Sequence, residues 1–440
     1  MTSENMKDLI LTSTAINELP SSIGSLRKLE TLTLDHCKSL SNLPNKVANL
    51  RSLRRLHIYG CTQLDASNLH ILVNGLKSLE TLKLEECRNL FEIPDNINLL
   101  SSLRELLLKG TDIESVSASI KHLSKLEKLD LSDCRRLYSL PELPQSIKEL
   151  YAINCSSLET VMFTLSAVEM LHAYKLHTTF QNCVKLDQHS LSAIGVNAYV
   201  NIKKVAYDQF STIGTNSIKF LGGPVDFIYP GSEVPEWFVY RTTQASVTVD
   251  LSSSVPCSKI MGFIFCVIVD QFTSNDKNYI GCDCYMETGV GERVTRGHMD
   301  NWSSIHACEF FSDHVCLWYD EKCCLKNQEC ESESIEELMA SYNPKISFEF
   351  FAKTGSIWEK RIDIMVNGCG VCPVYDTECD NFFKQMELEL EMTLQSMATK
   401  MSSKEATLAP KQVCKKLIFP HHQIGTWKNA TQELKDILFL

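Results

Sequence analysis

The sequence predicts an α/β solenoid of stacked repeats followed by an all-β sandwich of the jelly-roll or Ig-like type. Two observations support this prediction. A template of regularly spaced leucines recurs through the first third of the 440-residue chain, and the later part alternates short apolar runs with Gly, Pro and Ser. The length exceeds what one hydrophobic core organises, and the composition, 44% hydrophobic and 22% charged, excludes a disordered, fibrous or membrane-spanning chain.

The leucine template reads L-x-x-L-x-L-x-x-C. It opens at five positions that are 24, 26, 24 and 23 residues apart: Leu29, Leu53, Leu79, Leu103 and Leu126. Units of this length are typical of leucine-rich repeats, in which x-L-x-L forms a short strand and the remainder returns to begin the next one. One repeat cannot bury its own apolar face, so stacking has to supply the core. We expect about seven repeats over residues 1–160, the last a shortened unit from Ile147 to near Val161.

Cysteine recurs at one position of the template. The chain contains 19 cysteines but no secretory signal at its N-terminus, which favours reduced thiols over disulfides. Because a repeat position packs alike in every unit, we predict a buried ladder of cysteines: Cys37, Cys61, Cys87, Cys134 and Cys155. Thr14 and Thr111 replace the cysteine in units that are one residue shorter.

The x positions of each strand point away from the leucines and are expected to line the concave face of the solenoid. They mix charged, aromatic and aliphatic groups, which is typical of a surface that binds another protein, although an ordinary solvated sheet would look similar. The predicted protein-binding residues are Thr33, Asp35, Arg55, His57, Tyr59, Lys83, Glu85, Lys109, Asp130 and Tyr151. Buried arginine and aromatic anchors dominate such interfaces, which favours Arg55, His57, Tyr59 and Tyr151 among them.

Beyond the repeats the pattern changes. Residues 161–222 are predicted to form a helical cap and linker, and residues 223–379 contain seven or eight short strand patterns, which suit a sandwich or jelly roll. Trp237 follows a turn that contains two prolines and is expected to plug the core of this domain. Residues 380–440 are expected to form a helical or partly disordered tail.

Four sequence motifs that follow the repeats in a fixed order resemble those of a known protein family. The repeats contain LPxxI turns, and they are followed by FQNCVKLDQHSL, YPGSEVPEWFVYR, GFIFCVIV and CGVCPVYD. Over about residues 6–378 the chain resembles the C-terminal part of plant intracellular immune receptors of the TIR–nucleotide-binding–leucine-rich-repeat family. The resemblance implies a sensor in which the repeat face and the loops of the C-terminal jelly-roll/Ig-like domain contact a pathogen effector protein. In that family the amino-terminal TIR domain then cleaves NAD.

Signatures of catalysis and of cofactor binding are missing from the sequence. Since it contains no G-x-x-x-x-G-K-[ST] phosphate loop and no G-x-G-x-x-G, G-x-S-x-G or H-E-x-x-H motif, we expect a binding module without catalytic residues, cofactor or metal. The formal net charge of −11 argues against a nucleic-acid partner. The longest apolar run, Ile260–Val269, is about half the length of a membrane crossing, so we expect no membrane partner and a cytoplasmic or nuclear location.

Two functions stay open at this level. The chain is either an effector sensor or a regulatory module that holds a TIR/nucleotide-binding partner inactive, in cis or in trans. The repeat array begins without a polar cap before Leu9, from which we expect the chain to be part of a longer protein.

Overall fold

A computed structural model describes most of the chain. The described residues are 5–163, 176–213, 225–250, 260–273, 278–287, 293–305, 309–320, 345–354 and 362–375, so the predicted tail over residues 380–440 lies outside them. The chain divides into two compact units, one formed by residues 1–164 and 175–191 and the other by residues 165–174 and 192–440. Each unit is described by itself below.

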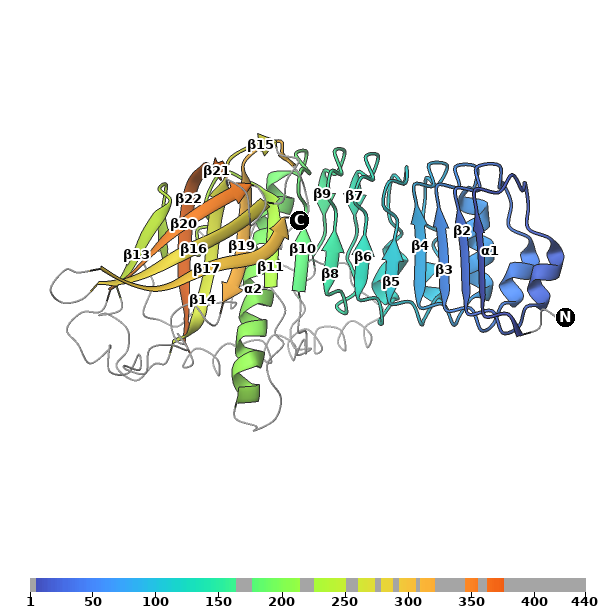
Figure 1. The fold of residues 1–440 in the computed structure, drawn as a ribbon, viewed down its shortest axis with the longest axis horizontal. Helices are drawn as coiled ribbons and strands as arrows, with labels where there is room; N and C mark the ends of the chain where they lie inside the picture. Colours follow the sequence, from blue (N-terminus) through green and yellow to red (C-terminus); the bar gives the residue numbers. More distant parts are fainter. Residues whose placement is uncertain are drawn as a thin grey trace, which may run out of the picture. The chain divides into compact units, whose positions relative to one another are not determined.

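The first unit is a solenoid built around a parallel sheet (Figure 1), which confirms the predicted leucine-rich-repeat fold. Successive repeats contribute one strand each, and neighbours pair in the order β1 (Asp8–Thr12), β2 (Thr31–Asp35), β3 (Arg55–Tyr59), β4 (Thr81–Glu85), β5 (Glu105–Leu107), β6 (Lys128–Asp130), β8 (Glu149–Tyr151) and β10 (Leu176–Thr179). Their register has no slips, so equivalent template positions lie side by side; Leu32, Leu56 and Leu82, for example, form one fully buried row.

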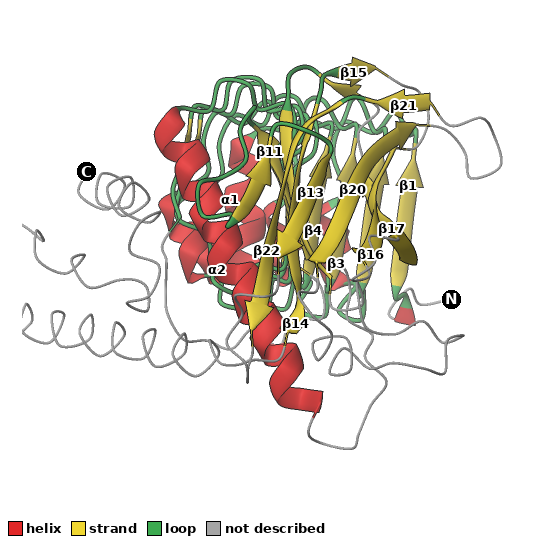
Figure 2. Ribbon diagram, turned by 90° about the vertical axis from the view of Figure 1, so that its left-hand side faces the viewer, coloured by secondary structure: helices red, strands yellow, loops and turns green. Residues whose placement is uncertain are grey.

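Short helices return the chain on the other side of the solenoid (Figure 2). They are the 3₁₀ helices η2 (Ser21–Ser25), η3 (Asn45–Asn49), η4 (Ile97–Leu99) and η5 (Ala118–His122), and the α-helix α1 (Ala66–Gly75). The longer unit from Leu53 accommodates α1, whose first turn is capped by the Asp65 carboxylate accepting from the Ser67 N–H. A second, short parallel ladder flanks the main sheet and contains β7 (Ser139–Leu140) and β9 (Thr160–Val161).

The solenoid continues past the last repeat that the leucine spacing indicates. Strand β10 pairs with β8 in parallel, and Asn182 and Cys183 follow it at the positions where other units carry their turn residue and cysteine. The sequence pattern instead predicts that this FQNC segment belongs to the cap. The leucine template hides the unit because Thr178 and Phe180 occupy positions that are leucines elsewhere.

The predicted cysteine ladder is confirmed and gains Cys183 as its last member. Each ladder thiol is buried and donates to a carbonyl oxygen of the preceding unit, at 3.2 Å from Cys134 to Leu108 and 3.1 Å from Cys155 to Leu131. Thr111 takes the place of cysteine in its unit, and its hydroxyl lies 3.3 Å from the Cys134 thiol. The ladder therefore gives each unit a polar contact with its neighbour inside an otherwise apolar core.

Burial makes these thiols unreactive, which is testable. Burial raises the pKa of Cys61 to about 11 and that of Cys134 to about 12, from an ordinary value of 9.0. Iodoacetamide reacts with the thiolate, so we expect alkylation of both residues in the folded protein to be at least about a hundredfold slower than in denaturant. Peptide mass spectrometry after timed alkylation measures the two rates. Equal rates would mean that the ladder is accessible in the native state.

A column of charges of strictly alternating sign runs along the solenoid, one residue before each of the strands β1–β6 and β8. Its members are Lys7, Glu30, Arg54, Glu80, Arg104, Glu127 and Lys148. Neighbours form ion pairs across units: Lys7 with Glu30 at 2.8 Å, Arg54 with Glu80 at 2.9 Å, and Glu127 with both Arg104 and Lys148 at 3.3 Å. We call this set the charge column.

The second unit contains most of helix α2 (Gln188–Ile213) and, among the described residues, twelve strands. One run of paired strands has the order β11 (Val225–Pro230), β19 (His314–Asp320), β14 (Ile260–Val269), β22 (Val366–Tyr375) and β12 (Tyr240–Thr242). A second sheet has the order β13 (Ser246–Asp250), β20 (Lys345–Thr354), β16 (Asn278–Glu287) and β17 (Arg293–Ile305), with β21 (Ile362–Ile364) on β20. The remaining pair is β15 (Phe272–Thr273) with β18 (Glu309–Phe310).

These strands outnumber the seven or eight that the sequence predicts. Some are only two or three residues long, and β17 (RVTRGHMDNWSSI) has no alternating apolar pattern, so a periodicity argument misses it. Trp237 is 9% exposed and stacks on Phe238 with ring centroids 4.0 Å apart, as expected for a buried plug. None of the described helices combines the length and apolar character that a membrane crossing requires.

One hydrophobic cluster draws on both sheets of the second unit. Phe265 on β14 and Trp318 on β19 come from the first run of strands, and Phe348 and Phe350 come from β20 of the second. The Phe265 ring lies 5.3 Å from Trp318, 5.2 Å from Phe348 and 5.7 Å from Phe350. Aromatic packing of this kind joins the two sheets through their buried faces.

Candidate protein-binding surface

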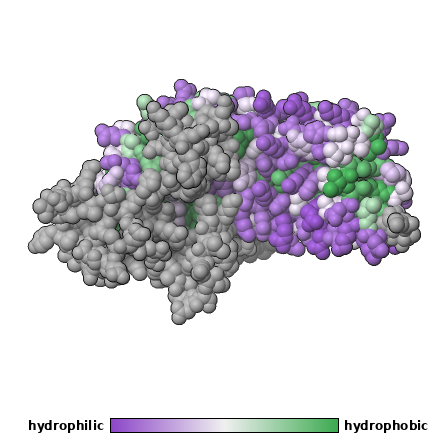
Figure 3. All heavy atoms as spheres, viewed as in Figure 1, coloured by the Kyte–Doolittle hydropathy of each residue, from purple (hydrophilic) through white to green (hydrophobic). Residues whose placement is uncertain are grey.

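All ten predicted binding residues lie on the side of the solenoid sheet opposite to its buried leucines, which we call the open sheet face. They come from β2, β3, β4, β6 and β8, with Lys109 just after β5. The register brings six of them into two rows, each crossing three strands: Thr33, His57 and Lys83 form one, and Asp35, Tyr59 and Glu85 form the other. The first row continues in register through Leu107 to Asp130 and Tyr151, which lie two and three strands beyond Lys83, so the ten residues spread along the sheet from β2 to β8 and do not form one compact cluster. Most of the solenoid surface that Figure 3 presents is hydrophilic, with a hydrophobic area towards the β1 end.

Basic groups gather at the middle of β3. The exposed Arg55 guanidinium donates to the Thr31 hydroxyl from Nε at 3.2 Å and from Nη2 at 3.0 Å. His57 is half-buried, and its Nε2 atom is shielded from solvent and has no hydrogen-bond partner among the residues that the structure describes. The pKa of His57 is lowered first by burial and then by the positive charges of Lys83 and Arg55, so the ring is neutral at pH 7. The positive charge here belongs to Arg55 and Lys83.

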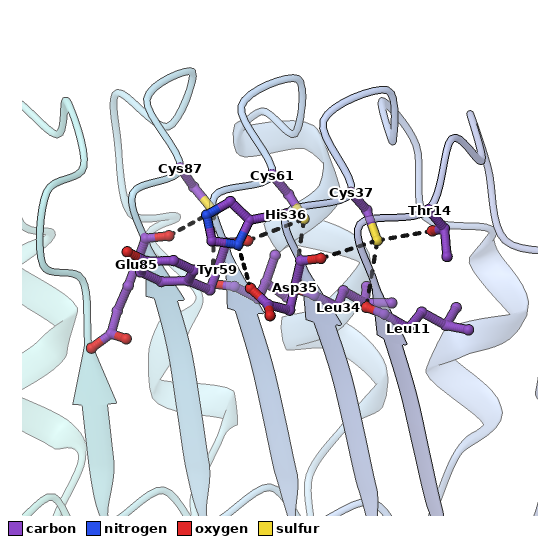
Figure 4. Close-up of polar contacts among 11 residues, drawn as sticks. Leu11, Thr14, Leu34, Asp35, His36, Cys37, Tyr59, Cys61, Glu85 and Cys87 are labelled. Atoms are coloured by element: carbon purple, nitrogen blue, oxygen red, sulfur yellow. Dashed lines mark hydrogen bonds and ion pairs between the residues drawn. The ribbon is translucent and has the colours of Figure 1, made fainter.

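An aromatic pair stands at the carboxyl end of the same strand (Figure 4). Tyr59 is 40% exposed, and the His36 ring packs edge-on against it with centroids 4.8 Å apart at an interplanar angle of 67°. His36 Nδ1 lies 2.6 Å from an Asp35 carboxylate oxygen, which fixes the orientation of the imidazole. Gly60 provides the space: at its φ of +63° a side chain would be strained, and a Cβ would lie 3.1 Å from His36 Cδ2.

His36 is the functional candidate that sequence reasoning missed. It lies between the x positions and the ladder cysteine, at a turn position where the backbone is left-handed, with a φ of 51°. Its N–H donates to the Tyr59 carbonyl at 2.7 Å, and equivalent bonds recur along the solenoid, for example from Glu86 to Lys109 at 2.8 Å. The signal available in the sequence is the contrast between His36-Cys37 and Gly60-Cys61 in adjacent units, where glycine leaves room for the imidazole.

The second predicted tyrosine is already engaged by the chain itself. The Lys128 ammonium lies 5.2 Å above the centre of the Tyr151 ring and 3.1 Å from the Glu149 carboxylate. The Tyr151 hydroxyl donates to Glu149 at 3.0 Å, and the His177 ring lies 4.8 Å away. Tyr151 is thus a structural contact between three units as well as a surface residue.

Among the described residues, no group of three or more His, Cys, Asp or Glu side chains is arranged to hold a metal ion. The arrangement on the open sheet face offers hydrogen bonds, charge and exposed aromatic surface in adjacent rows. These are the elements of protein recognition.

Two protein families match the chain. A leucine-rich repeat region matches residues 4–91, and the C-JID domain matches residues 229–401. Disease resistance-like protein DSC1 of Arabidopsis thaliana is 28% identical over 86% of this chain and 35% of its own length. Disease resistance protein RPS4 of the same plant is 28% identical over 62% of this chain and 22% of its own length. The leucine-rich repeat domain of the type III effector XopL aligns with 42% of this chain and 63% of that structure, at 28% identity and a TM-score of 0.35.

The chain is thus a leucine-rich-repeat protein with a C-JID domain, and both domains are binding or recognition modules. Together with the disease-resistance relatives, this combination confirms the resemblance to the C-terminal part of a plant TIR–nucleotide-binding–leucine-rich-repeat disease-resistance protein. The chain spans about a third or less of the length of these relatives.

Proposed function

We propose that the chain recognises a pathogen effector protein through the open sheet face of the solenoid and through loops of the second unit. The observation that carries this proposal is the register that places Arg55, His57 and Tyr59 between contrasting residues on β2 and β4. One row carries a hydroxyl and basic groups, and the other carries two carboxylates and an aromatic ring. A partner with complementary charges can recognise such a pattern, whereas a sheet that only faces solvent does not require any particular pattern. The disease-resistance relatives support an immune role for such recognition.

We also propose that the second unit folds as a β-sandwich. The two sheets that share the Phe265 cluster support a sandwich of the jelly-roll type over about residues 223–379, after repeats and a cap. We further propose a cytoplasmic or nuclear location, which the resemblance of the chain to plant intracellular immune receptors supports. Neither unit is proposed to carry catalysis.

A binding screen tests the proposed function. The full chain is presented to a collection of purified effectors from plant pathogens, and direct binding is measured by biolayer interferometry. We expect at least one effector to bind saturably and to lose binding when the open sheet face is altered. If every effector that binds is indifferent to changes on that face, recognition through the sheet is wrong.

A regulatory role is the second candidate, favoured by the fact that the chain matches only a part of longer relatives. Under this view the chain holds a TIR/nucleotide-binding partner inactive. Co-expression with such a fragment should then suppress NAD cleavage, measured as residual NAD by chromatography. Unchanged NAD loss would exclude this role.

A further inference from the structure

The second row of the open sheet face combines an exposed ring with two carboxylates. Tyr59 on β3 pairs in register with Asp35 on β2 and with Glu85 on β4. Neighbouring strands in a sheet lie about 4.8 Å apart, so a carboxylate stands on each side of the tyrosine ring. Figure 4 shows the three side chains on the same face of adjacent strands.

The solenoid fills two comparable sites with its own cations. At Tyr151 the Lys128 ammonium lies over the ring and pairs with Glu149. On the flanking ladder the Arg136 guanidinium lies 5.3 Å from the centre of the Phe91 ring and pairs with Glu114. In both sites an aromatic ring and a carboxylate hold one positive charge, a combination in which cation–π and Coulomb attraction add.

The row around Tyr59 has the ring and the carboxylates but no such cation. Within the described part of the chain, no lysine or arginine lies over Tyr59 or forms an ion pair with Asp35 or Glu85. Lys109, just after β5, is the next basic residue beyond Glu85 in this direction across the sheet. Its ammonium lies 3.9 Å from the Asp133 carboxylate, with which it forms an ion pair. Among the described residues, the Asp35 carboxylate bonds only to His36, through Oδ1, which leaves Oδ2 available.

We propose that Asp35, Tyr59 and Glu85 form a receptor for an arginine side chain of the bound partner protein, with His36 as the positioning residue for the Tyr59 ring. The inference rests on the proposed function and specifies its chemistry. A planar guanidinium stacks on the tyrosine face while its N–H groups donate to the carboxylates on either side, which a compact ammonium does less well. His36 holds the ring edge-on and is itself held by Asp35, so the platform is ordered before the partner arrives.

A small-molecule probe tests this site in the full chain without an effector. N-acetyl-arginine amide is titrated into protein with ¹³C-labelled tyrosine rings, and Tyr59→Phe assigns the signal. We expect saturable shifts of the Tyr59 resonances with millimolar affinity and none with N-acetyl-citrulline amide, the neutral isostere. The exposed Tyr138 serves as internal control, because its neighbour Glu114 is already paired with Arg136.

Two variants distinguish the binding role of the carboxylates from the positioning role of His36. Asp35→Asn combined with Glu85→Gln is expected to weaken arginine binding about fivefold, since two exposed charge pairs are lost. His36→Asn is compatible with the left-handed backbone at this position and keeps both carboxylates and the Tyr59 ring, so a positioning role predicts altered Tyr59 shifts in the free protein and weaker probe binding with little change in melting temperature.

The outcomes distinguish this inference from the proposed function. Equal shifts with citrulline, or no shift at Tyr59 up to solubility, would overturn the arginine receptor while leaving effector capture to its own test. If the shifts are specific to arginine but no effector binds in the screen, the arginine site is supported and the proposal that its partner is a pathogen effector is wrong.

Discussion

Alanine at both Arg55 and Tyr59 is expected to abolish effector capture without altering the melting temperature. Both side chains reach solvent, so truncation removes binding groups and leaves the leucine core intact. Arginine and tyrosine are enriched among residues whose loss costs about 2 kcal/mol or more at an interface. Losing both should weaken binding by at least about a hundredfold. Biolayer interferometry on the captured effector measures the affinity, and differential scanning calorimetry measures the melting temperature.

Arg51→Ala with Tyr138→Ala is the matched control. These residues have the same side chains and are exposed, but Arg51 follows helix η3 and Tyr138 lies on the flanking ladder. The control pair should bind like the unaltered chain. If the Arg55/Tyr59 variant also binds normally, the open sheet face plays no part in recognition.

Phe265→Ala is expected to lower the free energy of unfolding of the second unit by about 3–5 kcal/mol, the usual cost of removing a buried ring. The side chain is fully buried and contacts aromatic rings of both sheets, so a cavity would open where the sheets meet. Urea denaturation followed by tryptophan fluorescence reports this loss, since Trp318 lies 5.3 Å from the altered ring. Val239→Ala, at a 48% exposed position, should cost less than about 0.5 kcal/mol. A loss below about 1 kcal/mol for Phe265→Ala would contradict a shared core.

Sequence periodicity was sufficient for the parts of the fold whose residues repeat. Leu32, Leu56 and Cys61 recur because every unit meets the same neighbours, so their burial follows from the template. The leucine template does not detect the repeat that contains β10, because Thr178 and Phe180 occupy positions that are leucines in other units. The periodicity argument also misses strand β17, because its residues show no apolar alternation although it pairs with β16, the preceding strand in the sequence.

The sequence was sufficient to predict which residues lie on the open sheet face, but not which of them lie next to one another. Alternation placed Arg55, His57 and Tyr59 on one face, yet the rows depend on a register that survives the longer unit containing α1. The engagement of Tyr151 by Lys128 depends on side-chain conformations that spacing does not encode. His36 depends on a left-handed turn and on a glycine in the next unit.

The charge column limits how such an array can change in length. Loss of the single unit that carries Arg54 would bring Glu30 beside Glu80, and like charges would then repel across the new junction. Loss of that unit together with its successor would bring Glu30 beside Arg104, which restores an attractive neighbour. Removing an even number of units therefore preserves the alternation of the charge column, whereas removing an odd number places two like charges side by side at the new junction, where each exposed pair is worth about 0.2–1 kcal/mol.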